Sequence, residues 1–132
     1  MGDPETQSVM MRIKSDFVEL LIACAKGELK NQKIEVDPSY AVTVVITAGG
    51  YPEKYEKGKI ISGLENSSAQ VFHAGTKSSD GKTLTDGGRV LAVTGKGKSL
   101  KEAIQNSYNS VQKISWDSSH HRKDIGQDLL DA

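Results

Sequence analysis

Apolar side chains recur at intervals of three and four residues near the start of the chain, a spacing that predicts helix. The positions are Val9, Met10, Ile13, Phe17, Leu20, Leu21 and Cys24. This stripe ends at Gly27, a typical helix terminator, and we expect it to face a core. Asp16 and Glu19 have the spacing of a capping box, which favours two short helices that meet near Lys14 over one long helix.

The first residues predict a helix start. Asp3 can cap the helix, and Pro4 suits the first helical position because it loses only an N–H that would be unpaired there. Glu5 would then face the positive end of the helix dipole. We therefore expect the first helix to begin at Pro4.

The middle of the chain alternates strand and turn signals. Residues 41–48 are β-branched and almost entirely apolar, which predicts a central strand buried on both faces. Further strands are expected at 59–62, 70–74, 82–85 and 89–94, separated by turn-rich segments. Their close spacing indicates antiparallel pairing, and the glycines and lysines at 95–98 indicate a solvated loop.

A second helix is predicted after the strands. Ser99 and Glu102 form a capping box, and an apolar stripe runs from Leu100 to Lys113. The order of helix, strands, helix and polar end predicts one α+β domain, with a mostly antiparallel sheet flanked by helices on one side. The few aromatic residues supply three expected packing anchors, namely Phe17, Phe72 and Trp116.

Charge and cysteine content exclude several classes of function. The 132 residues carry 17 basic and 17 acidic side chains, so no overall field favours nucleic acid or a membrane surface. Aromatic residues are also too few to serve as stacking platforms for nucleic-acid bases. Cys24 is the only cysteine, which excludes an internal disulfide and fits the cytoplasm. The sequence shows no leader pattern and no apolar run near the roughly 20 residues that cross a bilayer.

Several polar motifs are candidates for ligand binding. His73 and Thr76 flank the end of a predicted strand, and Arg89 follows the glycine pair at 87–88. Arg122 and Lys123 lie in the polar end of the chain, and a guanidinium matches phosphate oxygens as a fork. The alternative for each is an ordinary surface contact or, for the glycine pairs, a tight turn.

The residues alone assemble no complete catalytic site. His120 and His121 are adjacent and point different ways, and no third metal ligand is evident. No Ser-His-Asp relay, Cys-His pair or isolated pair of carboxylates is recognisable. The residues alone therefore indicate a globular module, for which the binding of a phosphorylated ligand and a purely structural role of these side chains are both open interpretations.

Six motifs in order, however, resemble one family. They are GDPETQ, KSDFVELL, GGYPEKYEKG, VFHAGT, GGRVLAVTG and RKDIG, and they span the chain almost from end to end. This set resembles the C-terminal portion of the phosphoribosylamine-glycine ligases, ATP-grasp enzymes of de novo purine synthesis. The resemblance implies a helical segment over 1–30, trailing from an ATP-grasp body, and a C-terminal α+β domain over 31–132.

The resemblance also implies a reaction. Such a ligase joins glycine to 5-phospho-β-D-ribosylamine, with ATP hydrolysis to ADP and phosphate, and forms glycinamide ribonucleotide. Its ATP and Mg²⁺ (or Mn²⁺) would belong to the intact enzyme, because the family's metal ligands precede the Gly-Asp-Pro-Glu motif and would lie upstream of Met1. The resemblance therefore implies no catalytic residue, no metal ligand and no bound cofactor in this chain.

The C-terminal domain of such an enzyme would close one wall of the active-site cleft. The motif-matching positions that would face the phosphoribosylamine are His73, Thr76, Arg89, Arg122 and Lys123. The partners would be the ATP-grasp body and the two substrates, and the isolated chain is expected to be inactive. Loss of the body would expose an apolar face, so we expect self-association or modest stability. The alternative is a self-standing, non-catalytic module that binds a phosphorylated metabolite or a partner protein.

Overall fold

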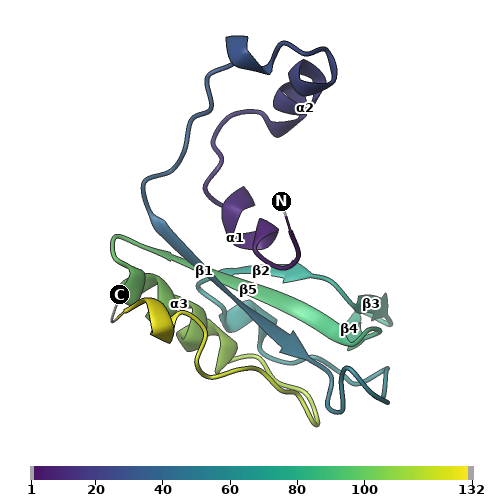
Figure 1. Ribbon diagram of the computed structural model, residues 1–132. Coiled ribbons are helices and arrows are strands. Elements are labelled where there is room, and N and C mark those ends of the chain that lie inside the picture. The colour runs from purple at the N-terminus through teal and green to yellow at the C-terminus, as the bar shows by residue number, and fades with distance from the viewer. Residues whose placement is uncertain (1, 131–132) are drawn as a thin grey trace.

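A three-stranded antiparallel sheet organises the protein, in a computed structural model that describes residues 2–130 (Figure 1). Its strands are β1 (Tyr40–Thr47), β5 (Arg89–Gly97) and β2 (Gln70–His73), in the order β1-β5-β2. The α+β architecture with antiparallel pairing is confirmed. The expectation that residues 41–48 form the central strand is wrong, because β5 occupies the centre and β1 lies beside it.

Burial explains the difference between these two apolar strands. In β1 the buried residues alternate with half-buried ones, so β1 is fully covered on one face only. In β5 the run from Val90 to Gly95 is buried on both faces. The two strands look alike in sequence because the half-buried face of β1 is also apolar or threonine-bearing, and periodicity does not distinguish such a face from a core face.

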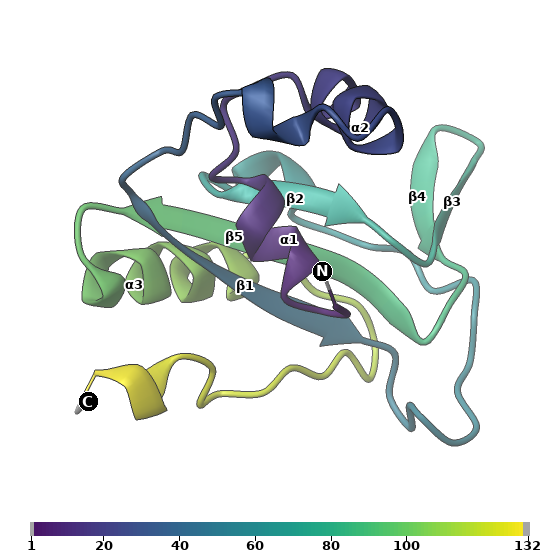
Figure 2. The same cartoon turned by 45° about the horizontal axis from the view of Figure 1, so that its top comes forward.

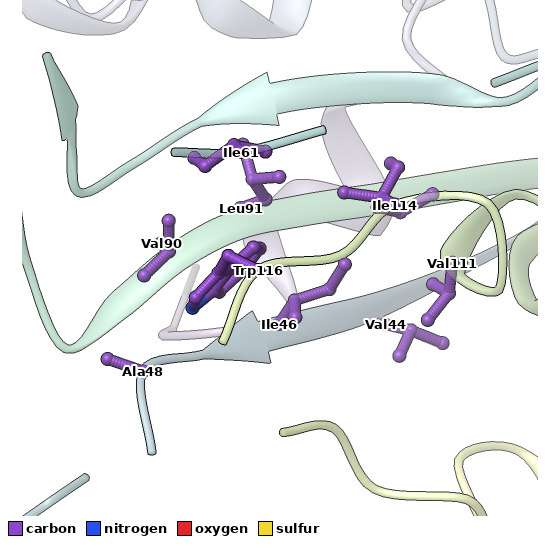
Figure 3. Packing of buried hydrophobic residues seen from close by; sticks show 10 residues of the cluster. Val44, Ile46, Ala48, Ile61, Val90, Leu91, Val111, Ile114 and Trp116 are labelled. Atoms are coloured by element: carbon purple, nitrogen blue, oxygen red, sulfur yellow. The ribbon is translucent and has the colours of Figure 1, made fainter. Parts of the chain in front are cut away.

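The core lies between the sheet and helix α3 (Leu100–Val111). Figure 3 shows Trp116 and Ile114, from the segment after α3, beside Val44, Ile46 and Leu91 of the strands. Trp116 is buried, as expected of a packing anchor, whereas Phe72 is exposed and Phe17 is half-buried. The core therefore includes the segment after α3 as well as the helix itself.

Ser107 joins α3 to two strands. Its hydroxyl donates to the carbonyl oxygen of Val42 in β1 at 2.6 Å and accepts from the amide of Gly95 in β5 at 2.8 Å. The helix approaches so closely that a Cβ on Gly95 would lie 2.7 Å from the carbonyl oxygen of Ala103. Gly95 therefore belongs to a buried strand under α3, and because β5 continues to Gly97 the expectation of a solvated loop at 95–98 is wrong for residues 95–97.

A separate hairpin consists of β3 (Thr76–Ser79) and β4 (Lys82–Thr85). The sequence pattern predicted β4 and not β3, because residues 76–79 are polar and exposed and lack the apolar alternation of a half-buried strand. Asp80 and Gly81 form the turn with positive φ values of 50° and 71°. The strand expected at 59–62 is reduced to two isolated bridges, between Ile60 and Leu84 and between Ser62 and Ser115, so that expectation is wrong.

The N-terminal segment forms two short helices, α1 (Thr6–Met10) and α2 (Phe17–Ala25). Asp16 caps α2 by accepting from the amides of Val18 and Glu19, as the spacing predicted. Asp3 does not cap α1, which begins at Thr6, because its carboxylate pairs with the guanidinium of Arg89 instead. Short 3-10 turns complete the chain at Leu29–Asn31, Leu64–Asn66 and Gln127–Leu129.

Helix α1 lies on the face of the sheet opposite to α3, which we call the outer face, so helices flank both sides and not one (Figure 2). The hydroxyls of Ser8, Thr43 and Thr94 form a chain with oxygen separations of 2.7 and 2.8 Å. Lys96 donates to the carboxylate of Asp37, a contact that holds the pKa of this carboxyl well below its ordinary value. The segment around α1 is thus fixed to the sheet.

Helix α2 stands away from the sheet (Figure 1), on a neck in which the amide of Lys14 donates to Glu35. Only Leu20 and Ala23 of α2 are buried. Leu21 is 54% exposed and Cys24 is exposed, so the expectation that the whole apolar stripe faces a core is wrong for this chain. No helix among residues 2–130 is long and apolar enough to span a membrane.

The two hydrogen bonds of the Ser107 hydroxyl, to Val42 and Gly95, form a clamp whose contribution to stability can be measured. Ser107→Ala leaves the buried amide of Gly95 without this acceptor, and we expect it to lower the free energy of unfolding by about 1–3 kcal/mol. Chemical denaturation monitored by circular dichroism measures the change. Ser115→Ala, at an exposed serine, is the control and should change stability by less than about 0.5 kcal/mol. Equal effects of the two substitutions would contradict the clamp.

Candidate functional site

A cleft of about 270 Å³ opens on the outer face, along β1. Its lining includes Thr43, Val45 and Thr47 of β1, together with Tyr51, Arg89, His120, His121 and Arg122. We call it the histidine cleft. It brings together Arg89 and Arg122, two of the residues singled out from the sequence.

The chain after the core returns to β1 and thereby carries Arg122 to the cleft. The amide of Thr47 donates to the carbonyl oxygen of His120 at 2.8 Å, and the amide of His120 donates back to Thr47 at 3.0 Å. The hydroxyl of Tyr108 donates to the carbonyl oxygen of Arg122 at 2.9 Å and accepts from the amide of Ile125 at 3.0 Å. Burial raises the pKa of this tyrosine, which keeps its hydroxyl protonated as a donor.

Arg89 is the first residue of β5, and its guanidinium holds Asp3 in a two-bonded ion pair. Nη1 and Nη2 donate to the two carboxylate oxygens at 2.6 and 2.7 Å. These hydrogen bonds lower the pKa of Asp3 and raise the pKa of Arg89. The preceding Gly88 lies directly against the ring of Tyr51, where a Cβ would collide, so this glycine serves close packing beside the arginine.

Arg122 also holds a carboxylate. Its Nε and Nη2 donate to the two oxygens of Asp124 at 3.0 and 2.6 Å, and both side chains are more than three-fifths exposed. Because exposed ion pairs are weak, typically ~1 kcal/mol or less, this pair can open for a stronger anion. The histidine cleft therefore contains two guanidiniums, each with a carboxylate partner that an anionic ligand would have to replace.

A second cleft of about 300 Å³ adjoins the first, because Val45, Tyr51 and Arg89 line both. We call it the glutamine cleft, after Gln7 of α1. The side-chain oxygen of Gln7 is buried and has no hydrogen-bond partner among the described residues. Arg89 thus stands at the boundary between the two clefts.

Lys123 faces a different cleft, between α3 and the C-terminal segment, which also includes Tyr108 and His121. His121 lines both this cleft and the histidine cleft. Burial, followed by the charges of His120 and Lys123, lowers the pKa of His121, so its ring is neutral near pH 7. The structure therefore separates Lys123 from Arg122, its neighbour in sequence.

His73 and Thr76 are close to each other and apart from the arginines. The Nδ1 atom of His73 lies 2.9 Å from the hydroxyl oxygen of Thr76, where β2 leads into β3. Neither side chain lines the histidine or the glutamine cleft, but Ala74 and Gly75 between them line the glutamine cleft. The loop, and not its two polar side chains, reaches the candidate site.

The described residues do not form a metal centre. Between residues 2 and 130, no three histidine, cysteine, aspartate or glutamate side chains gather closely enough to hold a metal ion. The described residues therefore do not fit a metal ion. Their charged groups are suited to binding and orienting an anion.

Sequence reasoning missed three contributors to this region. The sequence pattern assigns no separate role to Tyr51, places Tyr108 within a helical stripe and predicts Asp3 as a helix cap. The interactions of all three are long-range, so no local pattern reports them. The closest signal was the family motif that contains Tyr51.

Comparison with known proteins identifies the family. Residues 41–128 match the family model described as phosphoribosylglycinamide synthetase, C domain. A phosphoribosylamine–glycine ligase of Vibrio parahaemolyticus is 48% identical over 128 residues, covering 95% of this chain and 30% of the relative. The chloroplastic ligase of Arabidopsis thaliana is 46% identical over 131 residues, covering 95% of this chain and 25% of the relative.

A solved structure agrees with the sequence matches. The crystal structure of the phosphoribosylamine–glycine ligase of Thermotoga maritima superposes with a TM-score of 0.82 at 36% identity. The match covers 95% of this chain and 31% of that protein. This chain thus spans about a third or less of the length of these relatives. Its sequence and fold show that it belongs to the phosphoribosylglycinamide synthetase family and corresponds to the C domain.

Proposed function

We propose that this chain is the C-terminal part of a ligase that joins glycine to 5-phospho-β-D-ribosylamine with hydrolysis of ATP, in the cytoplasm. Residues 1–30 would lead from an ATP-grasp body, and residues 31–132 would form the domain that closes one wall of the active site. The length of the relatives supports this proposal, because the matched region is 30% of the Vibrio parahaemolyticus ligase.

The observation that carries the substrate-binding role is the convergence of two guanidiniums on one cleft. Arg89 begins the buried central strand and Arg122 follows the segment that pairs with Thr47, yet both line the histidine cleft. A guanidinium offers two parallel N–H groups that match two oxygens of a phosphate. The substrate's phosphate is the group in this reaction that such a cleft would recognise.

The chemical role of the domain would be orientation. Binding energy from a phosphate remote from the reacting amine can hold that amine in line for attack on an activated glycine. ATP and the divalent cation would be held by the rest of the enzyme, since the described residues of this chain do not fit a metal centre. His73, Thr76 and Lys123 would contribute at the edges of the substrate, from the β2–β3 loop and the cleft beside α3.

The exposed face of α2 suggests what isolation of the chain does. Val18, Leu21 and Ile22 are each about half exposed or more, on a helix whose composition suits a buried position. In the intact enzyme this face would be covered by the ATP-grasp body. In the isolated chain it would promote self-association, because exposed apolar surface is removed from water when two copies meet.

The role of the arginines is tested in the intact enzyme. Arg89→Ala and Arg122→Ala should each raise the KM for phosphoribosylamine by about tenfold, as expected for losing charged hydrogen bonds to a phosphate. Steady-state kinetics measures this change, with Lys101→Ala on the exposed side of α3 as the control. Unchanged Michaelis constants for phosphoribosylamine and glycine in both arginine variants would rule out the assignment.

Dependence on the rest of the enzyme is tested with the isolated chain. Purified residues 1–132, given ATP, Mg²⁺, glycine and phosphoribosylamine, should release no phosphate above a protein-free blank. Phosphate release that follows the concentration of the chain would show that the chain is catalytic by itself. The same result would contradict both the dependence on an ATP-grasp body and the alternative of a non-catalytic module.

Self-association is tested by introducing a charged residue into the exposed apolar face of α2. Leu21→Lys should lower the fraction of dimer or larger species, because a charged side chain is costly to bury in an apolar contact. Sedimentation velocity over a range of concentrations measures this fraction. Leu129→Lys is the control, because Leu129 is 58% exposed and lies near the C-terminus. A monomeric parent chain at every concentration would contradict the proposal.

A further inference from the structure

We propose that Asp3 is a built-in competitor for Arg89, so that a phosphate bound at the boundary of the two clefts displaces Asp3 and loosens the α1 segment from the sheet. This inference rests on the proposed function of Arg89. It adds a conformational consequence to phosphate binding and gives Asp3 the role of a positioning residue for the segment that precedes α2.

The first step is the occupancy of the guanidinium. Asp3 uses both Nη atoms of Arg89, at 2.6 and 2.7 Å. This edge is one of those at which a guanidinium presents two parallel N–H groups to a phosphate, the Nε–Nη edge that Arg122 uses for Asp124 being another. A phosphate that takes the Nη1–Nη2 edge of Arg89 must therefore replace Asp3.

Of the two partners, Asp3 is the one free to move, because Arg89 is part of the sheet. The main chain of Arg89 lies between Gly88 and Val90, which are both buried, and it pairs with Thr47 of β1. Asp3, in contrast, lies in a stretch from residue 2 to residue 5 that is exposed throughout. Exchange at Arg89 thus leaves the sheet in place and moves the N-terminal segment.

Helix α1 is held on the sheet with one buried polar atom that has no hydrogen-bond partner in the described structure. This atom is the side-chain oxygen of Gln7, one turn beyond Asp3. A buried acceptor without a partner is unfavourable relative to a hydrated one. Release of Asp3 would let water reach Gln7, which lowers the cost of moving α1 from the outer face.

The fourth step compares the two anions. The Arg89–Asp3 pair is 43% and 66% exposed, and pairs of this exposure are weak. A phosphate dianion carries more charge than a carboxylate, and a second guanidinium, that of Arg122, lines the same cleft. The phosphate is therefore the stronger partner of Arg89. By linkage, phosphate binding and the contacts that hold α1 on the sheet weaken each other by the same free energy.

The experiment is a titration of the ¹⁵N-labelled 132-residue chain with ribose 5-phosphate, and separately with inorganic phosphate, followed by NMR. Asp3→Asn removes the competing charge, and we expect it to bind ribose 5-phosphate about fivefold more tightly than the parent chain. Glu5→Gln makes the same change in net charge beside Asp3 and should leave the affinity within about twofold of the parent. In the parent chain, added phosphate should move the amide signals of Gln7 toward their positions in Asp3→Asn.

The outcomes separate this inference from the function on which it rests. If Arg89→Ala weakens binding but Asp3→Asn binds no more tightly than Glu5→Gln, Arg89 holds the phosphate and the competition is refuted. If Arg89→Ala binds as the parent does, the assignment of Arg89 in the proposed function falls, and the competition falls with it. Amide signals of Gln7 that stay fixed while ribose 5-phosphate binds would also overturn the release of α1.

Discussion

The pairing of β5 along both of its edges is the constraint on which the remaining structure depends. Strands β1 and β2 are each bonded to β5 and not to each other, and α3 packs against the same strand. A strand in this position must place small or apolar side chains on both faces, which Val90 to Gly95 do. Arg89 and Lys96, immediately before and after that run, then hold Asp3 and Asp37 of the N-terminal segment.

Local sequence patterns predicted the helices and strands better than the positions of these elements in the fold. The Ser99 and Asp16 caps were predictable because a cap is a contact between residues two or three positions apart. The central position of β5 was not, since strand order depends on pairing between distant segments. The polar β3 strand escaped recognition because a hairpin with both faces exposed to water has no apolar period to detect.

The candidate site was predictable to a similar extent. Arg89 and Arg122 could be selected from their chemistry and from the family motifs, but their meeting in one cleft required the backbone pairing of Thr47 with His120. Chemistry alone also grouped Lys123 with its neighbour Arg122. In the structure Tyr108 holds the carbonyl oxygen of Arg122, and Lys123 lines the separate cleft beside α3. Sequence thus indicates the candidate groups, and tertiary contacts decide which of them line the same cleft.

The return of the chain to β1 has a further consequence, for aggregation. An edge strand presents unpaired amides and carbonyls that another molecule can extend into a larger sheet. His120 occupies both the amide and the carbonyl of Thr47, and so protects the end of β1 from such intermolecular growth. The same backbone pairing therefore places Arg122 at the histidine cleft and covers part of a sheet edge.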